Sequence, residues 1–231
     1  VKIGYIHDTQ CVVYQGPDVA HQGKQICFAA NSFTSGGSGP DRLTIIDVTN
    51  KSVPSVISSR GYPGSGFIHQ GWLTEDHRYF LVDDELDETS FGHNTKTYMW
   101  DLLDLDAPVF MGFHSGPTTA IDHNQFIKGN YSYQANYTAG LRILDLTNLP
   151  SASLTEVAYF DIVPANNAAT FNGSWGVYPF FASGNVILSG ISGASTGGLF
   201  VLRPGLGADF TLSATPATLG VCGTASADAT L

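Results

Sequence analysis

Short apolar segments recur along the whole chain and alternate with polar turns. The segments are rich in Val, Ile, Tyr and Phe, and residues such as Gly, Pro, Asn, Asp and Ser separate them. This is the pattern of β-strands joined by turns. No window of helix length carries apolar residues at the i, i+3, i+4 and i+7 positions that a helix would bury. The pattern therefore predicts an all-β chain.

Two strand patterns repeat in a fixed order. An apolar strand that ends in a polar turn occurs at residues 43–49, 97–102, 141–147 and 199–204. Another strand precedes each copy and carries near its start His7, His69, His123 and, in the fourth copy, Trp175. These positions follow one another at intervals of 62, 54 and 52 residues, close to the length of a four-stranded propeller blade with one long loop. The repeats predict a β-propeller, most consistent with four blades of four antiparallel strands.

The two ends of the chain differ from the repeats. The fourth repeat supplies three strands, and residues 1–5 have the pattern of a strand that would complete this blade and close the ring. The alternative is that the leading strand belongs to an upstream blade of a larger ring. We expect residues 1–204 to form the propeller, and residues 205–231 to form a linker and the truncated start of an immunoglobulin-like C-terminal module.

Longer motifs accompany the repeated Leu-x-Ile-x-Asp strands, at residues 7–18, 69–77, 83–88 and 135–145. Together they resemble the LVIVD-repeat proteins, and specifically the choice-of-anchor B group of bacterial secreted or surface proteins. The resemblance covers residues 1 to about 204. It implies a β-propeller fold, export and a variable C-terminal anchoring or adhesion region. Members of that group continue further upstream, so the resemblance also implies that this chain is shortened at its N-terminus.

Charge narrows the choice of partners. Twenty acidic residues against ten basic residues give a net charge of −10, and no basic cluster occurs. Such a surface would repel a phosphate backbone or an anionic membrane. Residues 162–202 carry no ionisable charge, but Pro, Asn and Gly interrupt them, whereas a membrane helix needs about 20 consecutive apolar residues. We expect no nucleic-acid partner and no membrane span in this chain.

Three cysteines bear on the redox environment. Cys11 and Cys27 are sixteen residues apart on strands expected to be neighbours, where a disulfide is geometrically feasible in an oxidising compartment. The alternative is two buried thiols. Cys222 has no partner in this scheme and lies in the C-terminal segment.

His7, His69 and His123 occupy equivalent positions at the start of three blades. The first strand of each blade lines the central channel of a propeller, so these imidazoles are expected to point towards one axis. Three histidines from three blades would form a metal site with an open coordination position, which suits zinc, copper or iron. In the alternative, the histidines bind carbonyl groups of the next blade and hold the ring in register.

Three further residues accompany the histidines. Asp8 and Asp122 flank two of them, and each is a candidate for orienting a histidine ring, for transferring a proton or for binding the metal directly. Trp175 takes the place of the histidine in the fourth blade and is expected to form a wall of the channel.

An acidic run at Asp83, Asp84, Glu85, Asp87 and Glu88 suggests a second cation site. Oxygen-rich loops suit calcium, which would offset the repulsion among the carboxylates. The run lacks the Asp-x-Asp-x-Asp-Gly spacing of known calcium loops. We therefore expect an exposed, solvated acidic turn, with the calcium site as the alternative.

Two functions fit these observations. The first is a secreted or cell-surface binding or scaffold module, with an ion in its channel and loops that contact an extracellular polymer or a surface protein. The second is a metal-dependent enzyme, a hydrolase or an oxidoreductase, that uses the three histidines at the channel mouth to activate water or dioxygen. Fold alone does not separate these two functions.

Overall fold

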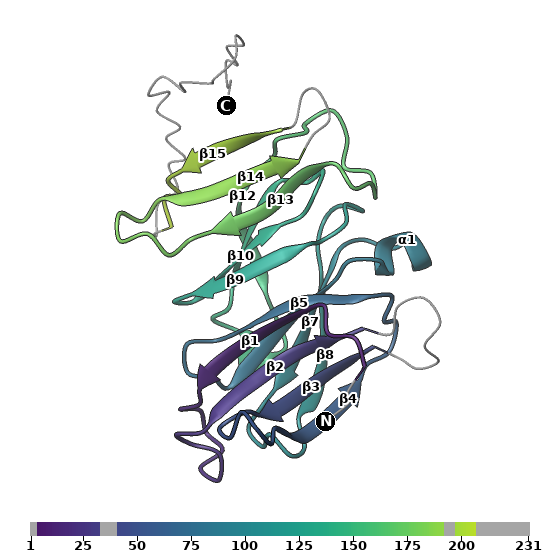
Figure 1. Ribbon diagram of the computed structural model, residues 1–231. Coiled ribbons are helices and arrows are strands. Elements are labelled where there is room, and N and C mark those ends of the chain that lie inside the picture. The colour runs from purple at the N-terminus through teal and green to yellow at the C-terminus, as the bar shows by residue number, and fades with distance from the viewer. Residues whose placement is uncertain (1–3, 33–40, 192–196, 207–231) are drawn as a thin grey trace.

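The computed structural model describes residues 4–32, 41–191 and 197–206. Within them the chain forms four antiparallel sheets (Figure 1). The first two sheets contain β1 (Asp8–Val13), β2 (Gln25–Asn31), β3 (Arg42–Asp47) and β4 (Ser55–Gly61), then β5 (Ile68–Leu73), β6 (Tyr79–Asp84), β7 (Lys96–Asp101) and β8 (Val109–Ser115). The last two contain β9 (Asn124–Lys128), β10 (Tyr131–Ala135), β11 (Leu141–Asp145) and β12 (Thr155–Phe160), then β13 (Gly173–Tyr178), β14 (Val186–Ile191) and β15 (Gly198–Leu202). A short helix, α1 (Asp87–Phe91), joins β6 to β7, and a 3₁₀ turn, η1 (Leu149–Ser151), follows β11.

Each sheet is a meander in which strands consecutive in the chain are hydrogen-bonded neighbours. The internal repeat also has a fixed irregularity. Between the third and fourth strands of the first three sheets, the register shifts at Ile45/Ile46, Met99/Trp100 and Ile143/Leu144. These shifts fall at the same position of the repeated Leu-x-Ile-x-Asp unit in each sheet. Each copy of the sequence repeat therefore carries a β-bulge at the same place.

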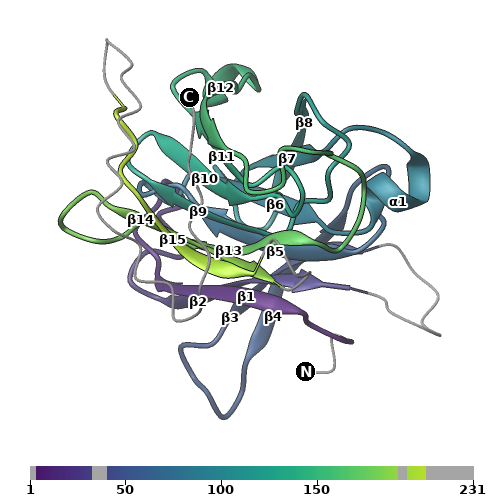
Figure 2. The same ribbon diagram turned by 90° about the horizontal axis from the view of Figure 1, so that it is seen from above.

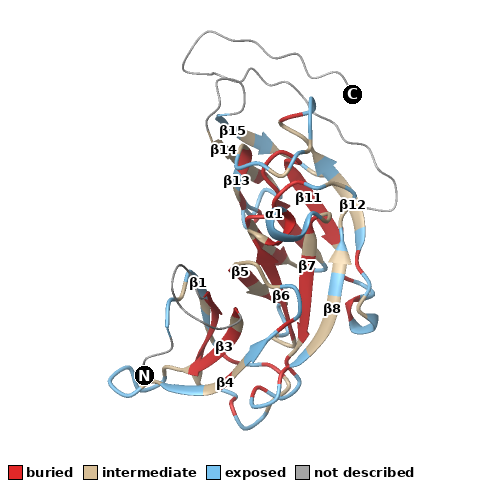
Figure 3. Ribbon diagram, turned by 90° about the vertical axis from the view of Figure 1, so that its right-hand side faces the viewer, coloured by how far each residue is buried: buried red, intermediate tan, exposed pale blue. Residues whose placement is uncertain are grey.

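The sheets pack face to face as propeller blades. Alternate residues of β6 point to opposite sides, because side chains alternate along a strand. Phe80 and Val82 pack against the first blade, while Tyr79 and Leu81 pack against the third. The strands between two blades are therefore buried on both faces, whereas the outer strands β4, β8 and β12 are more exposed (Figure 3). The predicted all-β, four-bladed propeller fold is confirmed.

The first strands of the blades form the inner edge of the molecule. Contacts run from β1 to β5, from β5 to β9 and from β9 to β13. The four sheets are stacked one on another, and they overlap when the molecule is viewed along the direction of stacking (Figure 2). Residues at equivalent positions near the starts of these strands are therefore neighbours. The candidate site lies at these positions.

The N-terminal segment lies against the first blade, and residues 1–3 fall outside the described residues. The side-chain amide of Asn31 donates to the carbonyl of Tyr5 at 2.7 Å, and the backbone N–H of His7 donates to the carbonyl of Ala30 at 2.9 Å. The described residues of the fourth sheet form three strands, and this sheet lies at the opposite end of the stack (Figure 1). The expected completion of the fourth blade is thus not seen in the described part, because the residues before β1 continue along β2.

A disulfide joins Cys11 and Cys27, which are paired directly across β1 and β2. This bond is consistent with an extracellular protein. No helix among the described residues is long and apolar enough to cross a membrane. The expected immunoglobulin-like segment and Cys222 lie outside the described residues.

Candidate functional site

Four rings form a column along the inner edge of the blades. The ring centroids of His7 and His69 are 4.3 Å apart, those of His69 and His123 are 4.3 Å apart, and those of His123 and Trp175 are 4.2 Å apart. The equivalent positions of the repeat thus lie side by side. His69 is placed between two other imidazoles, so the rings form a row.

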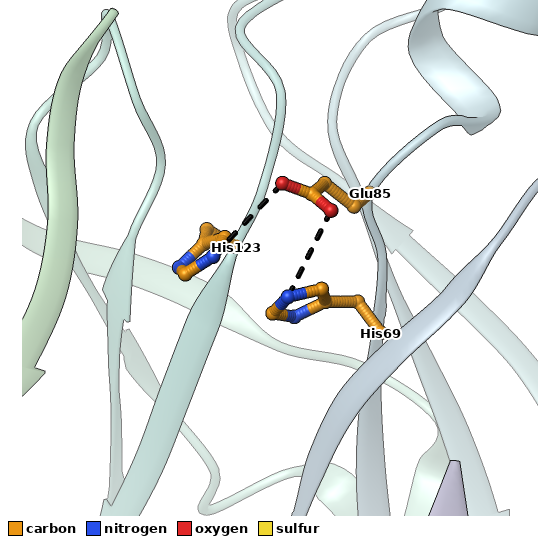
Figure 4. A group of neighbouring side chains, drawn as sticks. All are labelled: His69, Glu85 and His123. Carbon is orange, nitrogen blue, oxygen red and sulfur yellow. Dashed lines mark ion pairs between the residues drawn. The ribbon is translucent and has the colours of Figure 1, made fainter. Parts of the chain in front are cut away.

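Glu85 completes a group with two of these histidines (Figure 4). His69 Nε2 lies 3.7 Å from Glu85 Oε2, and His123 Nε2 lies 3.9 Å from Glu85 Oε1. One ligand atom from each of the three residues can be chosen so that all three lie within 4.8 Å of one another. Ligands bound to one metal at about 2.0–2.1 Å lie about 3–3.5 Å apart, so a small closure would produce a coordination site.

His7 lies beside this group and not within it. Its side chain is exposed, and its Nδ1 is 2.9 Å from the hydroxyl of Tyr5. The group of ligand atoms within 4.8 Å of one another thus contains Glu85, which follows β6 and comes from the acidic run, in place of the expected His7.

Neighbouring groups orient two members of the site. His123 Nδ1 donates to the backbone carbonyl of Trp175 at 2.5 Å, which leaves Nε2 as the lone-pair nitrogen of the neutral ring. The hydroxyl of Tyr137 donates to Glu85 Oε1 at 2.5 Å. His69 Nδ1 is buried, and a backbone group of His123 acts as a hydrogen-bond partner of the His69 ring. His69 and His123 thus each have a backbone partner on the next blade, as the alternative role of the histidines predicts.

Burial determines the protonation of the group. It lowers the pKa of His69 to about 3, helped by repulsion from His123 and His7, and lowers the pKa of His123 to about 4. Burial raises the pKa of Glu85, although the hydrogen bond from Tyr137 works against this shift. Both imidazoles are neutral near pH 7 and present lone pairs, and a bound cation would favour the ionised form of the buried carboxyl.

The aspartates that flank the histidines have other partners. Asp8 is exposed, and its Oδ1 accepts a hydrogen bond from the N–H of Thr9 at 2.6 Å. Asp122 is buried, and its Oδ2 accepts from the N–H of Asp84 at 3.3 Å. No hydrogen bond or ion pair found in the described residues joins either carboxylate to an imidazole of the column. The carbonyl of Trp175 orients His123 instead, while the Trp175 ring itself remains 44 % exposed.

The acidic run is buried, so the expected exposed turn is wrong for most of it. Asp83, Asp84, Asp87 and Glu88 are each at most 2 % exposed. Asp84 accepts hydrogen bonds from the Tyr62 hydroxyl at 2.6 Å and from backbone N–H groups of the segment before β5. The run is covered because α1 follows β6 directly and the neighbouring blades pack on both sides.

Tyr137 was not recognised from the sequence. It lies in the tight turn between β10 and β11, with φ of 27°, a value that residues other than glycine rarely adopt. Its carbonyl accepts from the N–H of Ser174 at 2.8 Å, which fixes this turn against the fourth blade. The motif at residues 135–145 marked the segment, but no spacing rule indicates where the hydroxyl points.

Two segments of the chain match a known repeat model. The LVIVD repeat model matches residues 39–60 and 125–161, which include the third strands of the first and third blades. At these two segments the chain is similar to the LVIVD repeat. The more specific choice-of-anchor B assignment remains a prediction.

One solved structure supports the fold, and a second is similar at a lower score. The periplasmic gluconolactonase PpgL of Pseudomonas aeruginosa matches with a TM-score of 0.54 and 14% identity over 78% of this chain. The match covers 53% of that protein, so this chain spans about half of its length. The β-propeller domain of Myceliophteria thermophila Cps50 (Swd1) matches with a TM-score of 0.49 and 17% identity, over 80% of this chain and 48% of that one. No curated protein matches the sequence. At these identities the likeness concerns the fold alone.

Proposed function

We propose that this chain is part of a secreted or cell-surface β-propeller that acts as a binding module and holds a divalent transition-metal ion at His69, Glu85 and His123. The observation that carries the proposal is the grouping of these three ligand atoms within 4.8 Å of one another at the inner edge of the blades. The Cys11–Cys27 disulfide supports an oxidising location.

The donor set favours particular metals. Two imidazole nitrogens and one carboxylate suit zinc, and the same set suits non-haem iron(II) when coordination positions stay open. Copper also accepts imidazole ligands. We place zinc first, because it tolerates a site with three protein ligands without a strict geometric preference.

Aromatic rings beside the metal site suit an extracellular polymer. The ring of Tyr137 meets those of Phe171 and Trp175 edge-on, at centroid distances of 5.5 and 6.0 Å. Phe171 and Trp175 are 53 % and 44 % exposed. Exposed rings of this kind stack on the apolar faces of other molecules, so we place the polymer contact here.

Elemental analysis of the purified protein tests the metal site. We expect one equivalent of zinc or iron in the wild type and its loss in His69→Ala and His123→Ala. His7→Ala separates the two ligand sets, because the group around Glu85 retains its metal without His7, whereas a three-histidine site loses it. His77→Ala is the matched control, since His77 lies in the β5–β6 turn and accepts a bond from the N–H of Gln15. A metal content that none of the site variants changes would refute the proposal.

A metal-dependent enzyme is the second candidate. Three protein ligands leave coordination positions for water or substrate, and the Tyr137 hydroxyl next to Glu85 provides a nearby proton carrier. Because one structural neighbour is a gluconolactonase, lactone hydrolysis is a suitable first assay for the metal-loaded protein. Turnover that disappears in His69→Ala together with the metal would favour the enzyme over the binding module.

A further inference from the structure

Five carboxyl groups are buried where β6 leads into α1, and four of them, all but the hydrogen-bonded Asp84, have oxygens without a partner in the described residues. Asp83 lies at the end of β6 on the side that faces the third blade, and Asp122 immediately precedes the first strand of that blade. Asp87 and Glu88 come from α1. The four side chains, which we call the acidic cluster, are 1%, 1%, 0% and 2% exposed respectively.

Five oxygen atoms of the acidic cluster have no hydrogen-bond partner in the described residues. They are Asp83 Oδ2, Asp87 Oδ1, both carboxylate oxygens of Glu88, and Asp122 Oδ1. The other three oxygens are bonded: Asp83 Oδ1 accepts from Gln125 at 2.7 Å, Asp87 Oδ2 accepts from the Tyr98 hydroxyl at 2.6 Å, and Asp122 Oδ2 accepts from the N–H of Asp84 at 3.3 Å. Glu88 is the extreme case, because the hydrogen-bonding groups that act on its buried carboxylate are only the Asp87 carboxyl and its own backbone N–H, among the described residues.

The protein supplies little positive charge to this cluster. His93 Nε2 lies 3.7 Å from Asp87 Oδ2, and Lys96 also acts on Asp87. Asp122 interacts electrostatically with Glu88, Asp83 and Asp87, so the carboxyls repel one another. A buried carboxylate without a partner costs several kcal/mol. The cluster therefore needs either protons or a cation.

We propose that Asp83, Asp87, Glu88 and Asp122 form a binding site for one calcium ion. Calcium takes six to eight oxygen ligands, accepts bidentate carboxylates and tolerates irregular geometry, whereas magnesium requires a strict octahedron and retains water. The five unpaired oxygens supply most of such a shell. The proposed calcium ligands are different residues from His69, Glu85 and His123, and they supply oxygen donors only.

The carboxyl oxygens of the acidic cluster are spread apart. Among the described residues, no three carboxylates of the cluster have oxygens that all lie within 4.8 Å of one another. A bound calcium ion would have to draw the oxygens to about 2.3–2.6 Å from itself. Burial and the neighbouring Asp87 raise the pKa of Glu88 to about 10. Protonation of Glu88 is thus the competing way to neutralise the cluster.

Calcium titration of protein stripped with EGTA tests the proposal. By calorimetry we expect one site for CaCl₂, and at a hundredfold excess over Kd the melting temperature should rise by about 5–10 °C. Glu88→Gln and Asp122→Asn should abolish the calorimetric signal and the calcium-dependent rise. Glu88→Gln should also raise the melting temperature of the stripped protein near pH 7, because the amide is neutral without the proton that Glu88 must take up on folding, and this gain identifies a folded variant.

Two controls separate this site from other binding. Asp104→Asn removes an exposed carboxyl and should leave the calcium response intact, which excludes general attraction to an acidic surface. His69→Ala should lose zinc and keep calcium, so failure of the transition-metal site does not decide the calcium site. If neither CaCl₂ nor EGTA changes the melting temperature of the wild type, the cluster is neutralised by shared protons and the calcium proposal is wrong.

Discussion

The hydroxyl of Tyr137 offers a single-atom test of the proposed transition-metal site. Tyr137 is 1% exposed, and its hydroxyl donates to Glu85 Oε1 at 2.5 Å. Its ring packs against His123, with centroids 5.3 Å apart. Tyr137→Phe keeps the ring and its packing and removes only the donor. The fold should therefore persist while Glu85 loses the group that orients it.

The expected effect follows from the surroundings of Glu85. Burial raises the pKa of this carboxyl and the Tyr137 hydrogen bond lowers it, so the variant should have a still higher pKa. A metal binds the ionised carboxylate and must then compete with a more tightly held proton. Loss of a group that orients a ligand weakens metal binding by about tenfold to a hundredfold, or about 1.4–2.8 kcal/mol. The loss should be larger at pH 6 than at pH 8, because the proton competes less as the pH rises.

Zinc titration against a chromophoric chelator measures this change. Tyr133→Phe is the matched control, since it removes the hydroxyl of another largely buried tyrosine from the same blade, on the face towards the fourth blade. It should leave zinc affinity unchanged. Equal zinc affinity of Tyr137→Phe and wild type at pH 6 would refute the assignment of Glu85 as a ligand.

Three further predictions concern stability. Replacing Cys11 and Cys27 together with Ala should lower the free energy of unfolding by about 3 kcal/mol in urea titrations, because the disulfide spans sixteen residues; no change would mean that the bond does not constrain the unfolded chain. Gly140→Ala should cost at least about 3 kcal/mol, since Gly140 has φ of 73° and a Cβ would overlap a carbonyl oxygen of β12. Gly129→Ala, with φ of 57° and open space around it, should cost about 1 kcal/mol, and equal losses would contradict the steric argument. In EGTA, the free energy of unfolding should fall as pH rises from 5 to 9, because Glu88, with its raised pKa, keeps in the folded protein a proton that the unfolded chain releases. Glu88→Gln should make the free energy of unfolding depend less on pH. An unchanged pH dependence in this variant would exclude Glu88 as its source.

The strand repeat and the position of the rings were predictable because both depend on local periodicity. Side chains alternate along a strand, and a repeated unit places equivalent residues at equivalent points of each blade. His69, His123 and Trp175 are therefore neighbours although more than fifty residues separate each from the next. Cys11 and Cys27 are directly paired for a related reason, because both belong to one hairpin.

The burial of the acidic run was not predictable from composition. Runs of like charge are usually solvated, and the path of α1 over this end of the blades is a tertiary feature. The direction of Glu85 depends on the turn between β6 and α1, where strand alternation no longer applies. The position of the Tyr137 side chain depends on a backbone conformation with positive φ. Among residue types only glycine reliably indicates such a conformation, so the sequence gives no sign of it at a tyrosine.

The two proposed cation sites use residues that are close together in the chain but offer different donor atoms. Whether zinc and calcium bind independently can therefore be tested. Glu85 lies two residues from Asp83, His123 follows Asp122, and Asp122 also acts electrostatically on Tyr137, but the two proposed ligand sets share no residue. Each ion should therefore still stabilise the protein when the other is bound, in a cycle of melts with neither ion, each ion and both. His69→Ala should remove the zinc contribution alone, and Asp122→Asn the calcium contribution alone. If one ion cancelled the stabilisation by the other, the ions would share ligands, and the division of the donors into a nitrogen-containing site and an oxygen site would then fail.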